Sequence, residues 1–399
     1  MPRKQKARKS HHGCFECKRR SVKCNEKRPQ CSHCENRQAI CHYAASGPWL
    51  WAETGAGHAM ATAMPEATIS SESATASHYA KQPGGQHASH GTATPMNEFN
   101  IPHLRLLLSW TTSTCHSISR NHADAGVWER IIPKRALSCP YILHGIFTVS
   151  ALHLALSDEC DGIEQQALIE DAGHHQSGAI KMFTNPSDVA GPSEHLESFA
   201  LSSLLIISAF AFPLVISRRS QAKSNPLDEL VGVFMLIRKM INFSTPIMDG
   251  VKKSELSGLF LLEDVESSPS ESSQRAIASL HELLSTVCSP SHENYEVFTR
   301  TIDRLEKLFS QLDSKYETIS GSFNWVCDVP AAYIDLLQEH DPLALVILAH
   351  YCVVLHQLRK RWWISSWGRL VLDAVVETLS PTWSSSVAYA IHAIDTPVY

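Results

Sequence analysis

Six cysteines within 28 residues constrain this chain more than any other feature of its sequence. They follow the pattern Cys14-x2-Cys17-x6-Cys24-x6-Cys31-x2-Cys34-x6-Cys41, in which one C-x2-C-x6-C unit occurs twice. Thiolates satisfy the tetrahedral preference of zinc, and a C-x2-C pair brings two sulfurs toward one point. The first residues, Met-Pro-Arg-Lys-Gln-Lys, lack the apolar core of a secretory signal. We therefore expect a reducing compartment, which favours metal binding over disulfides.

The number of cysteines predicts how many zinc ions they hold. A closed tetrahedral zinc site takes four ligands, so six cysteines exceed one site and fall short of two separate ones. Six sulfurs complete two sites only if two of them bridge both metals. A zinc knuckle that holds a protein interface and a disulfide knot are the alternatives. The sequence thus predicts two Zn2+ ions held by Cys14, Cys17, Cys24, Cys31, Cys34 and Cys41.

Positive charge is concentrated around these cysteines. Residues 1–43 hold 12 Lys and Arg against 3 Asp and Glu, a net charge of +9, whereas the rest of the chain carries −14. A polyanion such as DNA is therefore expected at this end of the chain. For any one basic residue, a solvated charged face is the alternative. The candidate DNA-binding residues are Lys18, Arg19, Arg20, Ser21, Lys23, Lys27 and Arg28.

Composition divides the chain into four predicted parts. A basic arm (1–12) precedes the cysteine module (13–43), and residues 44–96, rich in Ala, Ser, Thr, Gly and His, are predicted to be a disordered linker. Residues 97–399 are predicted to be an all-α regulatory domain, because their apolar residues recur at helical spacing. The linker shows no heptad repeat, so the sequence leaves a homodimer open. The predicted helices are 101–118, 140–157, 161–184, 194–212, 227–243, 273–287, 293–316, 330–339, 341–361 and 367–379.

Prolines and one long apolar segment lead to further expectations. Pro140 and Pro342, which follows Asp341, are expected in first helical turns, and Pro213 is expected to end the apolar block before it.

Phe199–Ile216 has 18 residues without a charge, the length of a short membrane span. Its three serines, its proline and the lack of a second comparable segment favour a buried core helix. No membrane span is therefore predicted.

The cysteine module resembles the fungal Zn2Cys6 binuclear cluster, with the same cysteine spacing and basic residues between the second and third cysteines. The resemblance implies that Cys14 and Cys31 bridge the two metals. Cys17 and Cys24 would then complete one zinc site, and Cys34 and Cys41 the other.

The same resemblance implies how the module would bind double-stranded DNA. A short helix after the second cysteine would enter the major groove at a CG-containing triplet, with Lys18, Arg19 and Arg20 as the base readers. Lys23, Lys27 and Arg28 would contact phosphates, which position the protein without specifying sequence. Members of the family usually carry a basic residue where this chain has Ser21, so the base preference is expected to differ in detail.

Residues 100–399 are similar to the regulatory domain of fungal sterol uptake control proteins. The similarity rests on the segments 110–119, 127–156 and 226–240, with Trp128, Pro133 and Pro140. It implies a helical domain that regulates the DNA-binding half, and ergosterol as a ligand.

Together these features predict a nuclear, sequence-specific DNA-binding regulator of RNA polymerase II genes that contacts the transcription machinery. A pathway-specific regulator whose helical domain binds only proteins is one alternative, and a zinc-stabilised scaffold without DNA function is another. No enzyme is predicted, because the chain lacks the GxSxG, GxxxxGK[ST], HExxH and GxGxxG motifs.

Overall fold

The computed structural model describes part of the chain. The described residues are 17, 20, 22–25, 27, 31–37, 99–157, 160–184, 194–219, 224–261, 270–312 and 319–396. The chain divides into two units, Met1–His90 and Gly91–Tyr399, which we treat separately. The predicted arm (1–12) and linker (44–96) lie outside the described residues, and the boundaries between the four predicted parts stay predictions.

The second unit is built from helices, and its described residues contain no strand. This confirms the all-α prediction. Its α-helices are α3 (Ile101–Ser109), α4 (Cys115–Ile118), α5 (His122–Gly126), α6 (Ile132–Ala136), α7 (Pro140–Ala155), α8 (Gly162–Thr184), α9 (Glu194–Arg219), α10 (Pro226–Ser244), α11 (Met248–Lys252), α12 (Glu271–Val287), α13 (Tyr295–Leu312), α14 (Ile319–Asp328), α15 (Ala331–Gln338), α16 (Pro342–Gln357), α17 (Trp367–Thr378) and α18 (Ser384–Asp395). Shorter 3-10 or π segments are η1 (Trp110–Thr114), η2 (Val127–Ile131), η3 (Thr245–Ile247), η4 (Ser257–Phe260), η5 (Leu358–Lys360) and η6 (Pro381–Trp383).

Two predicted helix starts are confirmed. Helix α7 begins at Pro140 and α16 at Pro342, where a missing backbone N–H costs no intrahelical hydrogen bond. The Asp341 carboxylate caps α16 by accepting hydrogen bonds from the backbone N–H groups of Leu343 at 2.9 Å and Ala344 at 3.0 Å. An N-cap of this kind satisfies donors that the helix leaves unpaired.

The expectation for Pro213 was wrong. Helix α9 continues through Pro213 to Arg219. Leu214 and Val215, which follow the proline, are 4% and 0% exposed, so burying them offsets the cost of a proline inside a helix. In the turn before Pro213, the Phe210 carbonyl accepts a hydrogen bond from the Trp367 indole at 2.9 Å.

Several elements were not predicted, namely α5, η2 and α6 between residues 122 and 136, and α11, α14 and α18. The predicted helix 101–118 is interrupted by the π segment η1, and η2 is a second π segment. Each π segment contains a tryptophan, and the two tryptophans are in contact. The Trp110 indole N–H donates to the Trp128 carbonyl at 3.0 Å, and the two rings pack edge to face. The two π segments are thus joined by one contact between buried tryptophans.

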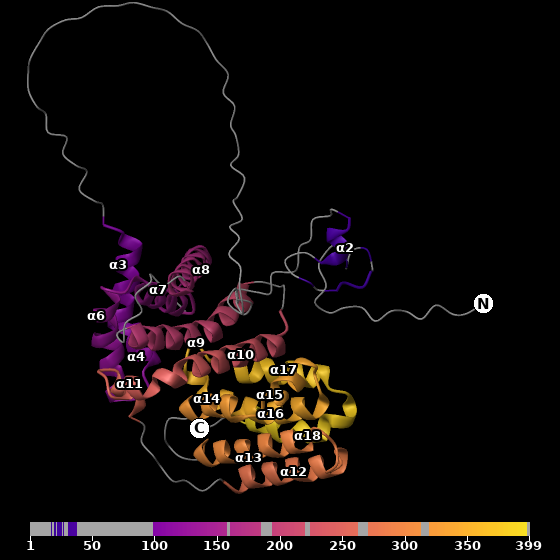
Figure 1. Cartoon of the computed structure of the whole chain (residues 1–399). Coiled ribbons are helices and arrows are strands. Elements are labelled where there is room, and N and C mark those ends of the chain that lie inside the picture. The colour runs from indigo at the N-terminus through magenta and orange to yellow at the C-terminus, as the bar shows by residue number, and fades with distance from the viewer. Residues whose placement is uncertain are drawn as a thin grey trace, which may run out of the picture. The chain divides into compact units, whose positions relative to one another are not determined.

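Two helices form the centres of packing in this unit. Helix α7 packs against α3, α8 and α9, and α16 packs against α13, α15, α17 and α18. Every residue from Leu343 to Leu355 of α16 is buried. Figure 1 shows α9 and α10 running between the α3–α8 group and the α12–α18 group. A helix buried on all sides explains why α16 is apolar around its whole circumference.

Three helical stretches have the length and apolar composition that could cross a membrane: His195–Arg218, Pro226–Lys252 and Pro342–Lys360. The share of each apolar window that is buried inside the structure is 72%, 39% and 78%, respectively. The statement that Phe199–Ile216 has no comparable second segment was therefore wrong. Burial of the first stretch agrees with the prediction of a core helix there.

Six further cysteines are spread through the helical unit, and the sequence gives them no metal-binding spacing. Three of them are buried: Cys115, Cys288 and Cys352. The other three are half-buried: Cys139, Cys160 and Cys327.

Candidate metal centre and nucleic-acid interface

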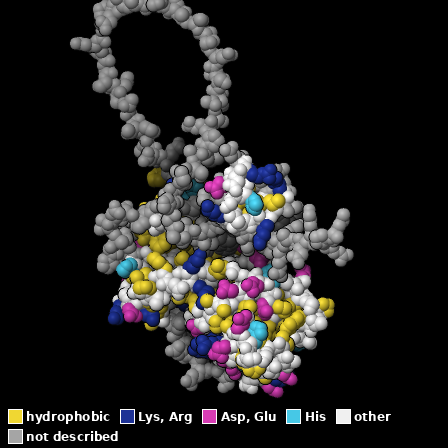
Figure 2. Space-filling model, turned by 45° about the vertical axis from the view of Figure 1, so that its right-hand side comes forward, with side chains coloured by type: hydrophobic (Ala, Val, Ile, Leu, Met, Phe, Trp, Pro, Cys, Tyr) yellow, Lys and Arg dark blue, Asp and Glu magenta, His cyan; other side chains and the backbone are white. Residues whose placement is uncertain are grey.

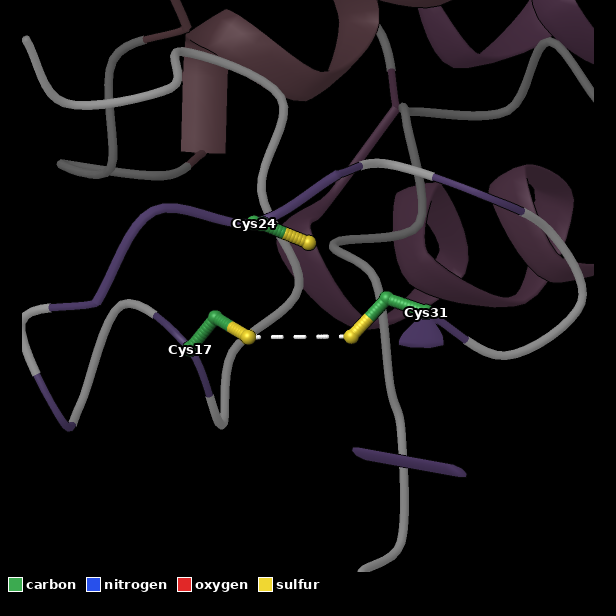
Figure 3. A group of neighbouring side chains, drawn as sticks. All are labelled: Cys17, Cys24 and Cys31. Carbon is green, nitrogen blue, oxygen red and sulfur yellow. Dashed lines mark hydrogen bonds between the residues drawn. The ribbon is translucent and has the colours of Figure 1, made fainter. Parts of the chain in front are cut away.

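Three of the predicted zinc ligands come together in the first unit. The sulfur atoms of Cys17, Cys24 and Cys31 all lie within 4.8 Å of one another, and the three residues are 2%, 3% and 0% exposed. Figure 3 shows their side chains pointing into one space from three separate stretches of the chain. Cys34 is also buried. Cys14 and Cys41 lie outside the described residues.

The spacing of these sulfur atoms fits a zinc ion. The Sγ atoms of Cys17 and Cys31 are 3.6 Å apart. Tetrahedral zinc with Zn–S bonds of about 2.3 Å places two sulfurs about 3.8 Å apart, along one edge of the tetrahedron. Three buried thiols are also the soft donor set that zinc accepts.

The short helix α2 (Ser32–Glu35) positions the Cys31 side chain. Cys31 is its N-cap, with extended backbone, and its Sγ accepts a hydrogen bond from the Cys34 backbone N–H at 3.4 Å. An N–H group that points at sulfur stabilises negative charge there, as the start of a helix does for anions. The C-x2-C spacing thus places the second cysteine one turn on, with its own N–H directed at the first sulfur.

Two residues that the sequence analysis missed hold the cluster together. Asn25 follows Cys24, Ser32 follows Cys31, and their side chains are joined by a hydrogen bond of 2.8 Å from Asn25 Nδ2 to Ser32 Oγ. The Ser32 backbone N–H donates to Asn25 Oδ1 at 3.1 Å. This pair ties the Cys24 stretch to the start of α2. Its sequence signal was a small polar residue directly after each of the two cysteines.

The described basic residues of the module surround the buried sulfurs on the outside. Arg20, Lys23 and Lys27 are exposed. Lys18, Arg19, Ser21 and Arg28 lie outside the described residues. The structure therefore brings three of the predicted DNA-binding side chains to the surface of the module, where they are accessible to a polyanion.

The helical unit has a different surface. On the face drawn in Figure 2, Asp and Glu side chains are interspersed with Lys, Arg and apolar side chains over the helical unit. On this face, mixed charge of this kind gives no continuous positive field along which a DNA backbone could lie. The charge asymmetry of the sequence and the exposed basic residues of the module make the first unit the candidate for polyanion binding.

Comparison with known proteins shows a similarity between part of the first unit and a known family. Residues 12–49 match the family described as the fungal Zn(2)-Cys(6) binuclear cluster domain. Together with the convergence of Cys17, Cys24 and Cys31, this match confirms the prediction of a module that binds two zinc ions.

Two curated proteins are similar to the chain beyond this module. A Zn(2)-C6 fungal-type transcription factor of Gibberella zeae is 22% identical over 425 residues, which covers 96% of this chain and 84% of that protein. The Zn(2)-C6 fungal-type transcription factor afumD of Aspergillus fumigatus is 30% identical over 150 residues, 37% of this chain and 33% of that protein. The first similarity extends through the helical unit as well as the module.

Proposed function

We propose that this chain, a DNA-binding transcription regulator with a fungal-type Zn(2)-Cys(6) module, is located in the nucleus. There it binds specific DNA sequences at genes transcribed by RNA polymerase II. The observation that carries the proposal is the set of three converging, buried cysteines with exposed Arg20 and Lys23 between them in the sequence. Zinc supplies folding energy to a module too small for a hydrophobic core of its own. The protein supplies the basic surface.

We assign the six cysteines to two metals. Cys14, Cys17, Cys24 and Cys31 would hold one zinc, and Cys34 and Cys41 would complete the other with the bridging sulfurs of Cys14 and Cys31. The group of Cys17, Cys24 and Cys31 supports this division, because these are three of the four ligands assigned to one ion. Cys34 is buried but stands outside that group.

We assign the basic residues to two kinds of DNA contact. Lys18, Arg19 and Arg20 would read bases at a CG-containing triplet, where a bidentate contact to guanine contributes about 1–3 kcal/mol of discrimination. Lys23, Lys27 and Arg28 would contact phosphates. The exposure of Arg20, Lys23 and Lys27 supports the assignment, and Ser21 would weaken readout at its position.

Binding of the full chain to labelled duplexes tests these roles. The zinc-loaded protein should bind a duplex with a CG-containing triplet more tightly than one in which the triplet is scrambled. Arg20→Ala should reduce that difference, whereas the matched variant Lys23→Ala should weaken both complexes equally and lower the salt dependence of binding. Equal binding of both duplexes at every salt concentration would contradict sequence-specific reading, and binding of neither duplex would leave a zinc-stabilised scaffold as the better description.

We assign regulation and contact with the transcription machinery to the helical unit. The alternative of a metabolic gene-cluster regulator differs in using this unit for protein contacts alone. A homodimer stays a prediction, which sedimentation of the full chain at micromolar concentration tests.

Sterol control is the finer expectation that the resemblance to sterol uptake control proteins adds. A sterol pocket would draw on apolar helix such as Phe199–Phe212, whose residues are buried or half-buried throughout. Packing inside the protein accounts for that apolar content without a ligand. Thermal unfolding of the full chain with ergosterol tests the expectation, and an unchanged Tm at saturating sterol would remove it.

A further inference from the structure

A groove of about 740 Å³ lies between α12 and α18. Ala276, Leu280 and Leu283 of α12 line one wall, and Ala276 and Leu280 are 4% and 1% exposed. His350 of α16 and Tyr389 of α18 also line it. The groove therefore combines an apolar wall with a titratable side chain from the most buried helix of the unit, a combination typical of sites for small organic molecules.

His350 has one polar atom to offer a ligand. The residue is 2% exposed, and its Nδ1 lies 2.9 Å from the Val346 carbonyl, so Nδ1 carries the proton and donates it. Within the described part of the chain, this is the hydrogen bond that the ring makes. Burial lowers the pKa of His350 to about 4. At neutral pH the ring is therefore uncharged, and Nε2 is a hydrogen-bond acceptor.

Charge around the groove favours an uncharged ligand. Arg275 and Glu282 line the groove with opposite charges. The Arg275 guanidinium is also 4.0 Å from the Glu271 carboxylate and donates to the Glu271 carbonyl at 3.4 Å. A carboxylate ligand would be repelled by Glu282 and attracted only by a partly neutralised Arg275, and an ammonium ligand attracted by Glu282 would also meet the positive charge of Arg275.

An aromatic row favours a flat ligand. The His350 ring stacks on Tyr389 with centroids 5.5 Å apart and an angle of 14° between the planes. Tyr389 in turn lies against Phe309, with centroids 6.2 Å apart. Aromatic pairs at such distances gain stabilisation beyond that of buried area, so another flat ring next to His350 would extend the row.

Hydroxyl groups on both walls add to the polar lining, which also includes the His392 imidazole. Ser279 of α12 and Ser385 and Ser386 of α18 line the groove. In the described part of the chain, their side chains make no hydrogen bond, so they can donate to an oxygen atom of a ligand.

We propose that the groove between α12 and α18 binds a small uncharged phenol, whose hydroxyl donates a hydrogen bond to Nε2 of His350. A phenolic O–H is a stronger donor than an aliphatic one, and its ring matches the aromatic row. Its oxygen can accept a hydrogen bond from a serine hydroxyl at the same time. This site goes beyond DNA binding and does not depend on it.

Three probes with similar carbon skeletons test the proposal: 2-naphthol, 2-methoxynaphthalene and decahydro-2-naphthol. Titration calorimetry with the zinc-loaded full chain should give the highest affinity for 2-naphthol, about tenfold above 2-methoxynaphthalene, since one hydrogen bond separates the two. Equal affinity for these two would overturn the role of Nε2. Equal or tighter binding of the saturated alcohol would overturn the phenol assignment in favour of an alicyclic alcohol, and binding of none of the three would overturn the site.

Variants locate the binding. His350→Phe keeps a ring but removes the acceptor, and should weaken 2-naphthol binding about tenfold while 2-methoxynaphthalene is unaffected. Because His350 is buried and this variant can fail to fold, Ser279→Trp provides a second test from an exposed position by filling the groove. Its matched control is Ser285→Trp, on the same helix but away from the groove lining. Loss of binding in Ser279→Trp alone supports the site, and equal binding in both variants overturns it.

Discussion

Gly368→Ala should destabilise the helical unit because the backbone of α16 lies close to α17 at this glycine. A Cβ atom at position 368 would lie 2.6 Å from the Cys352 carbonyl oxygen, 2.6 Å from the His356 backbone nitrogen and 3.0 Å from the His356 Cα. All three are backbone atoms of α16. No rotation of a side chain can therefore relieve the overlap.

The size of the effect follows from this geometry. Ordinary contact begins at 3.4 Å, so one methyl group requires α17 to move by about 0.8 Å. Trp367, Val371 and Val375 of α17 are 1%, 0% and 0% exposed, and their packing would be disturbed by the same movement. Overpacking of a core costs about 1–3 kcal/mol, and we expect about 3 kcal/mol because the obstacle is a helix backbone.

Urea unfolding followed by circular dichroism at 222 nm measures this change. The control is the same substitution at Gly232 in α10, where an added Cβ meets nothing within 4 Å. Gly232→Ala should stabilise the protein by about 0.5–1 kcal/mol, because alanine loses less conformational freedom in a helix. The two variants should thus have shifts of opposite sign. An unfolding midpoint for Gly368→Ala at or above that of the unsubstituted protein would refute the close approach of α16 and α17.

Three further predictions concern other parts of the chain. Asp341→Ala removes the N-cap of α16 and should cost about 1 kcal/mol in urea unfolding, whereas an unchanged midpoint would deny the cap a role. Burial and then the neighbouring His144 lower the pKa of His175 to about 4. The free energy of unfolding should therefore be independent of the protonation of His175 above about pH 6.5. It should fall by about 3 kcal/mol between that pH and pH 4, because His175 takes up a proton at a higher pH in the unfolded chain than in the folded one. His175→Gln should flatten that pH profile. Asn25→Ala should weaken zinc binding about tenfold in a chelator competition, as loss of a supporting hydrogen bond does, and equal retention of zinc would contradict its role.

The sequence predicted the metal module from its spacing, because ligand count and metal geometry act over a few residues. The convergence of Cys17, Cys24 and Cys31 needed no knowledge of tertiary structure. The hydrogen bonds between Asn25 and Ser32 also lie next to those ligands, but small polar residues are too common for their position alone to identify them.

Helices were predictable where apolar periodicity ran long, as in α8 and α12. Residues 122–136 escaped prediction because their position depends on distant contacts: Arg120, which donates to the buried Asp124, also donates to Ser320 Oγ at 2.7 Å, and Asn121 donates to the Leu261 carbonyl at 2.7 Å. For Pro213, a local rule failed because burial of the residues after it decided the outcome. The groove at His350 could not be predicted, because it depends on how α12, α16 and α18 pack.

Selection of bound sequences from a random DNA pool tests the central claim most directly. The zinc-loaded full chain and Cys31→Ala should be compared under the same salt concentration, since salt alone changes affinity. Cys31 is assigned to both metals, so its loss should unfold the module while the helical unit keeps its circular dichroism. The account predicts enrichment of CG-containing triplets by the zinc-loaded chain and none by Cys31→Ala. Equal enrichment by both proteins, or no enrichment by either, would contradict it.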